Sequence, residues 1–165
     1  MVGAANGSSA GAGARVEGLE VLERARERGA RLLSVEKLPA QGNASSEGVG
    51  GAFLLVFEVG RILVTARPAA RSIHLMAIED VADVPGGLEP AAEEEPWWRL
   101  LGRPLTQAGA EGANGALSLR FGAESEAPRR VRILREGEAL HAWLERDDDA
   151  PASSRRTADS DEESR

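Results

Sequence analysis

The chain has 165 residues, enough for one domain with a modest core. It contains no cysteine, which excludes disulfides, thiolate nucleophiles and cysteine-based zinc or iron-sulfur sites. The net charge of -7 disfavours a general nucleic-acid or anionic-membrane binder, because those partners are engaged by an excess of Lys and Arg.

The N-terminal part of the chain predicts a tail, a helix and a first strand. Residues 1–14 are small and low in hydrophobicity, so they cannot bury enough surface to offset chain entropy, and we expect a disordered tail. Residues 16–28 carry apolar side chains at helical spacing between Glu and Arg, and Gly29 is a suitable residue to end this helix. Residues 30–38 predict a strand.

The most apolar stretch of the chain runs from Gly51 to Glu79 and predicts three consecutive β-strands. Its first strand also carries Leu54 and Val56 on a second face, so this strand should lie centrally, with cover on both sides. The residues expected to alternate onto the core face are Phe53, Leu55, Phe57 and Val59, then Ile62, Val64 and Ala66, then Ile73, Leu75 and Ala77.

The second half of the chain repeats this arrangement in weaker form. A Pro- and Gly-containing connector leads to Pro96, which opens a short helix predicted over residues 97–101. Alternating patterns then predict a second meander, and an acidic, Ser-rich stretch at 147–165 predicts a second disordered tail. The strands of this meander are expected at residues 105–108, 116–121, 130–135 and 139–145.

Two pairs of segments resemble each other: GAFLLVF resembles GALSLRF, and SIHLMAI resembles ALHAWLE. These likenesses suggest an internal duplication of residues 16–79 and 96–145 within one globular domain, residues 15–146. The predicted fold class is α+β: mainly an antiparallel β-sheet of seven or eight strands in two meanders, with two short helices and disordered termini.

Chemistry-bearing motifs are scarce. His74 and His141 are the two histidines, and Glu145 follows His141 on the same strand face, but no His-Glu-x-x-His motif links them. The sequence therefore predicts no catalytic residue, no cofactor and no metal site. A small hydrolase or metal-dependent enzyme that uses His74 or His141 stays as the alternative.

Two groups of residues are candidates for binding a partner. Trp97 and Trp98 either pack over the sheet as part of the core or form an exposed aromatic pair that binds another protein. Arg120, Arg130 and Arg132 point outward from two strands, either as a solvated face or as a docking surface for acidic groups.

The leading hypothesis is a non-enzymatic, cytoplasmic protein-binding or adaptor protein, with toxin-neutralising or regulatory roles as examples. The expected partner is a protein rather than a nucleic acid or a membrane. The high content of Ala, Gly, Arg and Glu is typical of a GC-rich bacterial genome.

Overall fold

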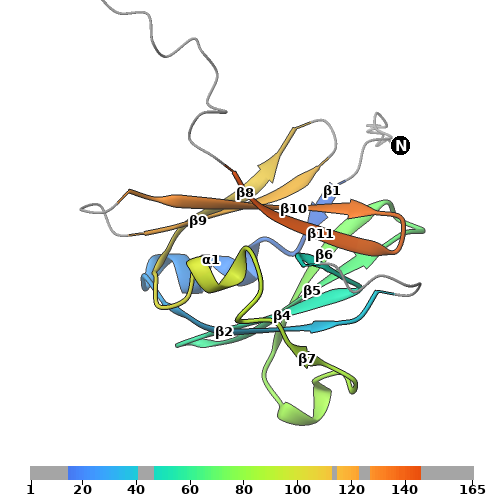
Figure 1. Ribbon diagram of the computed structural model, residues 1–165, viewed down its shortest axis with the longest axis horizontal. Coiled ribbons are helices and arrows are strands. Elements are labelled where there is room, and N and C mark those ends of the chain that lie inside the picture. The colour runs from blue at the N-terminus through green and yellow to red at the C-terminus, as the bar shows by residue number, and fades with distance from the viewer. Residues whose placement is uncertain (1–14, 41–46, 113–114, 123–126, 146–165) are drawn as a thin grey trace, which may run out of the picture.

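The structure is a computed structural model that describes residues 15–40, 47–112, 115–122 and 127–145. Most of these residues form β-strands, which are arranged as two facing sheets (Figure 1). All but one of the strand pairs are antiparallel, so the prediction of a mainly antiparallel β protein is confirmed. The tails predicted at 1–14 and 147–165 lie outside the described residues.

The larger sheet contains six strands, which are β1 (Arg15–Glu17), β2 (Leu32–Leu38), β4 (Ala52–Phe57), β5 (Gly60–Arg67), β6 (Ser72–Ile78) and β7 (Glu89–Pro90). Their order is β1-β6-β5-β4-β2-β7. Strand β4 therefore lies inside the sheet, as expected from its two apolar faces. The short β1 pairs in parallel with the first half of β6, and β7 pairs with β2.

The smaller sheet contains five strands, which are β3 (Val49–Gly50), β8 (Leu105–Glu111), β9 (Ala116–Phe121), β10 (Arg129–Glu136) and β11 (Ala139–Glu145). Their order is β3-β11-β10-β9-β8. Each half of the chain thus builds one four-stranded meander, β2-β4-β5-β6 or β8-β9-β10-β11. The segments that resemble each other occupy equivalent places: β4 matches β9, and β6 matches β11.

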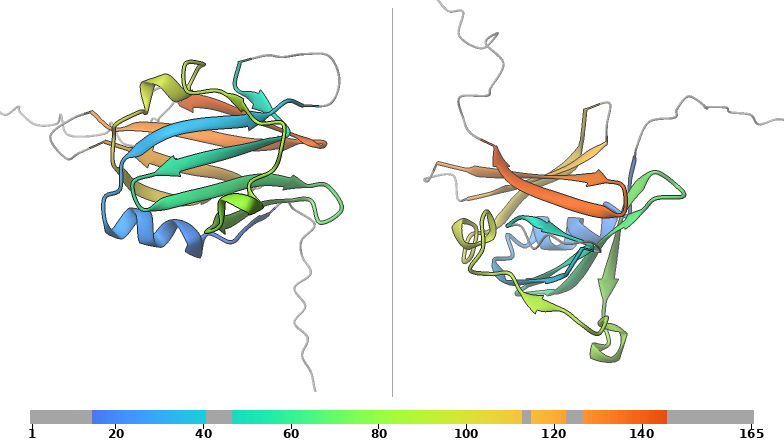
Figure 2. Two further views of the ribbon diagram at one scale, coloured as in Figure 1. Left: turned by 90° about the horizontal axis from the view of Figure 1, so that it is seen from below. Right: turned by 45° about the vertical axis from the view of Figure 1, so that its right-hand side comes forward.

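One α-helix, α1 (Glu20–Glu27), lies along the side of the two layers and contacts β8 and β6 (Figure 2). It begins later than the predicted helix, because Val16 belongs to β1 and Gly18, at a φ of +86°, turns the chain between the strand and the helix. Two single turns of 3-10 helix complete the fold, η1 (Val81–Asp83) and η2 (Trp97–Arg99).

The core lies between the two sheets and confirms the burial predicted for Phe53, Leu55 and Phe57. The aromatic rings of Phe57 and Phe121 stack across the interface, with ring centres 6.4 Å apart and planes 8° from parallel. α1 adds Leu22 and Ala25 to this core, so the helix closes one side of the sandwich.

The outward face of the larger sheet carries a second, smaller apolar cluster of Ala52, Leu54, Leu63 and Ile78. Val84 and Leu88 pack against this cluster. They come from the segment of residues 79–90, which contains η1 and β7 and lies below the sheet in Figure 1. Strand β4 is therefore covered on both of its faces.

Two details of the predicted fold class were wrong. The described residues form eleven strands rather than seven or eight, and a single α-helix rather than two. The additional strands β1, β3 and β7 have only two or three residues, too few to show an alternating pattern; they exist because longer strands pair with them. The second predicted helix is the single turn η2.

Candidate functional site

Trp97 and Trp98 are neighbours in sequence but face opposite environments. The Trp97 side chain is fully buried, with its ring centre 5.1 Å from that of Phe53 on β4. Its indole Nε1 has no hydrogen-bond partner among the described residues. Trp97 therefore covers the core and presents no surface to a partner.

Trp98 is 48 % exposed and is nevertheless held in place from two sides. Its indole Nε1 donates a hydrogen bond of 2.9 Å to Oε1 of Glu95, and the guanidinium of Arg99 lies 4.4 Å from the ring centre. Arg99 Nε in turn donates to both carboxylate oxygens of Glu95, at 2.9 Å each. We call Glu95, Trp98 and Arg99 the Trp98 anchor.

Electrostatics reinforces this anchor. The hydrogen bond from Arg99 is the main cause that lowers the pKa of the Glu95 carboxyl, with a smaller contribution from Trp98; partial burial opposes both. The same bond raises the pKa of Arg99. Arg129 of β10 donates to the carbonyl oxygen of Arg99 at 3.1 Å, which ties the anchor to the smaller sheet.

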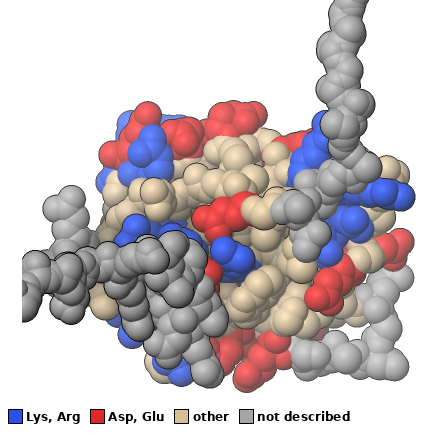
Figure 3. Space-filling view, turned by 90° about the horizontal axis from the view of Figure 1, so that it is seen from above, with Lys and Arg blue, Asp and Glu red and all other residues tan. Residues whose placement is uncertain are grey.

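Arg120, Arg130 and Arg132 all lie on the outward face of the smaller sheet. Arg130 is opposite Arg120 on β9 and opposite Glu145 on β11, and Arg132 is opposite Ser118 on β9, so the three arginines are neighbours on this face. Figure 3 shows this face from above, with basic and acidic side chains next to one another.

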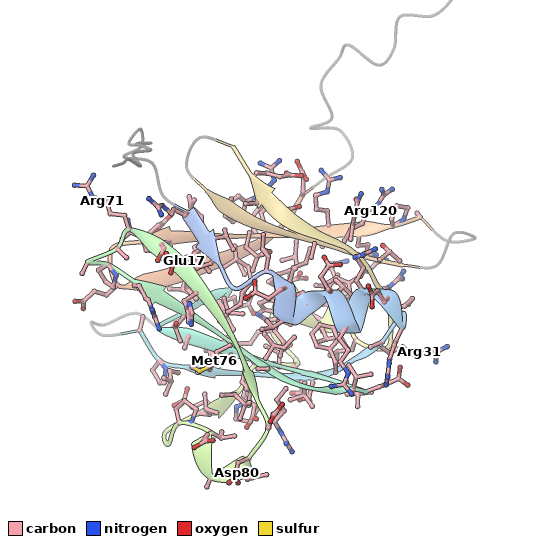
Figure 4. The ribbon with its side chains drawn as sticks, turned by 180° about the vertical axis from the view of Figure 1, so that it is seen from behind. Glu17, Arg31, Arg71, Met76, Asp80 and Arg120 are labelled. Carbon is pink, nitrogen blue, oxygen red and sulfur yellow. The ribbon has the colours of Figure 1, made fainter. Side chains whose placement is uncertain are left out.

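Two of these arginines are already paired with acids. Glu145 lies 3.4 Å from Arg130 and 3.2 Å from Arg132, and Glu111 of β8 lies 2.8 Å from Arg132 and 3.7 Å from Arg130. Arg120 projects from the sheet (Figure 4) and makes no ion pair with any other residue that the structure describes. The face is thus largely self-neutralised.

The two histidines lie on different sheets. His74 of β6 has its Nδ1 3.9 Å from Glu17 of β1, and His141 of β11 has its Nδ1 3.7 Å from Glu136. Glu145 bonds the arginines rather than His141. Within the described part of the chain, no group of three or more His, Asp or Glu side chains is arranged to hold a metal ion.

Sequence reasoning missed several residues that the structure brings together. The spacing of Glu95 and Arg99, four residues apart, is a recognisable ion-pair signal. Glu111 gave no such signal, because it lies on β8 and reaches Arg132 on β10 across the intervening strand β9. The sequence also gave no signal for the pair of Lys37 and Glu94, which are far apart in the chain. Lys37 of β2 is 3 % exposed, and its Nζ lies within 2.9 Å of both carboxylate oxygens of Glu94.

No protein-family model, curated protein or solved structure matches this chain. No helix among the described residues is long and apolar enough to cross a membrane.

Proposed function

We propose that this protein is a non-enzymatic protein-binding or adaptor module that docks onto a partner protein through the Trp98 anchor. The observation that carries the proposal is that Trp98 is half exposed yet fixed by Glu95 on one side and Arg99 on the other. Toxin-neutralising and regulatory roles are examples of what such a module does.

Physical reasons support this assignment. Trp and Arg dominate the hot spots of protein interfaces, because they bury a large area around a few polar atoms. A side chain that is immobilised before binding loses less conformational entropy when the complex forms, which saves about 0.5 to 1.5 kcal/mol per side chain. Glu95 provides this order, since it bonds both Trp98 and Arg99.

The other candidates have less support. Arg130 and Arg132 would have to leave Glu111 and Glu145 before they could meet an acidic partner. The alternative of a small hydrolase or metal-dependent enzyme would depend on a single histidine with one carboxylate near it, at 3.9 Å for His74 and 3.7 Å for His141. Neither arrangement favours that alternative over binding.

The test is a quantitative affinity capture from the organism that encodes the protein, with the wild type and three variants as bait. Trp98→Ala should lose the partner, and Glu95→Gln should weaken capture because it removes the negative charge that holds Arg99 against the indole ring. Leu33→Ala is the matched control, since Leu33 is 54 % exposed and lies outside the anchor.

A captured protein counts only if it binds again when both components are pure. We expect its Kd to rise at least about tenfold with Trp98→Ala, equivalent to about 1.4 kcal/mol. Equal capture by the wild type, Trp98→Ala and Leu33→Ala would refute docking through the anchor.

A further inference from the structure

The first residue of β6, Ser72, is fully buried, and its hydroxyl oxygen has no hydrogen-bond partner among the described residues. The next residue, Ile73, belongs to the core between the sheets, so Ser72 lies on the outward face of the larger sheet. A buried hydroxyl without a partner is unfavourable. A ligand group that accepts its hydrogen bond removes this penalty, so Ser72 marks a candidate binding site.

Two arginines flank Ser72 on the neighbouring strands. Arg15 of β1 is opposite Ser72 on one side, and Arg67 of β5 is opposite it on the other. Opposite residues share a face of the sheet, and the adjacent Val16 and Ala66 pack against the core, so both arginines lie on the outward face with Ser72. Neighbouring strands are about 4.8 Å apart, so the two arginine Cα atoms are about 10 Å apart, and each side chain is long enough to reach the space above Ser72.

Positive charge is in excess around Ser72. Arg15 and Arg67 are exposed, and neither forms an ion pair or a side-chain hydrogen bond with another described residue. Arg71, in the turn between β5 and β6, adds a third unpaired charge; its carbonyl oxygen accepts from the N–H of Arg15 at 3.2 Å, and its side chain points into solvent (Figure 4). The acid of β1, Glu17, has His74 as its partner at 3.9 Å, and residues 1–14 contain no Asp or Glu.

From these features we infer that Arg15, Arg67 and Ser72 bind a phosphomonoester, with one guanidinium group on each side of the phosphate and the hydroxyl beneath it. Each guanidinium group binds two oxygens through its fork of N–H donors. A carboxylate has only two oxygens, which suffice for one fork, whereas the three terminal oxygens of a phosphomonoester accept from both forks and from the hydroxyl. Its charge of about -2 near pH 7 also matches two guanidinium groups. Because the arginine side chains are exposed and unpaired, they can admit the phosphate to Ser72 without a change of the backbone.

The binding test titrates the full chain at constant ionic strength and follows the backbone amide signals of Arg15 and Ser72 by NMR. The probes are inorganic phosphate, acetate, and a capped glycine pentapeptide with a central serine or phosphoserine. Phosphate and the phosphopeptide should shift both signals saturably, and acetate should bind at least about tenfold more weakly because it satisfies one fork only. Tighter binding of the phosphopeptide than of phosphate would identify a phosphorylated protein as the source, and equal or weaker binding a small phosphomonoester. Equal binding of phosphate and acetate, or no saturable shift with either phosphate probe, would refute the site.

Two variants locate the site. Ser72→Ala removes a hydroxyl that has no partner, so it should leave the thermal melting temperature unchanged or higher and still weaken phosphate binding. Arg15→Gln combined with Arg67→Gln should weaken phosphate binding at least about tenfold. Arg28→Gln combined with Arg31→Gln is the matched control, because it removes the same charge from exposed arginines at the opposite end of the molecule, where Figure 4 shows Arg31. Phosphate binding that is unchanged in Ser72→Ala or in the Arg15 and Arg67 variant, both folded, or that falls equally in the control, would refute the site.

Discussion

The two sheets bury the same kind of inward face but differ on their outward faces. The inward residues of β4 are Phe53, Leu55 and Phe57, and those of β9 are Leu117, Leu119 and Phe121. The outward positions of β4 are the apolar Leu54 and Val56, and the corresponding residues of β9 are the polar Ser118 and Arg120.

This difference determines what must cover each sheet. The apolar outward face of the larger sheet is covered by Val84 and Leu88 from the segment of residues 79–90. The outward face of the smaller sheet instead carries ion pairs between Arg130, Arg132, Glu111 and Glu145. The same apolar inward face is thus compatible with two kinds of outward face. An apolar outward face needs a covering segment, whereas a charged one is stable in contact with water.

The largest effect should come from the shared interior. We expect Phe57→Ala and Phe121→Ala each to lower the free energy of unfolding by about 3 to 5 kcal/mol, because each leaves a cavity where the two rings stack. Denaturant unfolding of both variants measures this. A loss below about 1 kcal/mol for either would show that the sheets do not share one core.

The outward positions should behave unequally. Leu54→Ala should cost about 2 to 3 kcal/mol, since Leu54 is buried beneath the covering segment. The equivalent change on the smaller sheet, Ser118→Ala, should cost less than about 1 kcal/mol, because it removes one hydroxyl and no apolar contact. Similar losses of unfolding free energy for Leu54→Ala and Ser118→Ala would contradict the difference between the two outward faces.

The ion pairs of the smaller sheet should contribute little. Glu145→Gln removes the negative charge that pairs with Arg130 and Arg132. Because all three side chains are partly exposed, the change should cost about 0 to 1 kcal/mol, less at high salt. Unfolding at low and at high salt measures the difference. Glu138→Gln is the control, because Glu138 is exposed and has no ion pair with a described residue.

The smallest effect concerns Glu95, which lies outside both sheets. Because its pKa is lowered in the folded state, its interaction with Arg99 and Trp98 is fully present above about pH 4.3, the ordinary pKa of Glu, and is lost as the pH falls through the lowered value. The NMR signal of the Trp98 indole N–H should shift over that acidic range. The signal of the buried Trp97 should not follow it, and Glu95→Gln should abolish the step.

Local alternation was sufficient to predict the long strands and the buried face of β4, because a half-buried strand repeats every two residues. It could not predict β1, β3 and β7, which depend on pairing with distant residues. For the site, the sequence identified Trp98 and the three arginines as candidates. It could not show that Trp97 faces inward, or that Glu111 reaches Arg132 from a strand two positions away in the sheet.

Lys37 is the single lysine in the sequence, and its ammonium group is buried beside Glu94. Amine-directed reagents therefore find no exposed lysine side chain on the folded domain. Modification of Lys37 by an N-hydroxysuccinimide ester would require β2 to move away from Glu94. The rate of Lys37 labelling, followed by mass spectrometry, would report the local opening of β2 in the unmodified sequence.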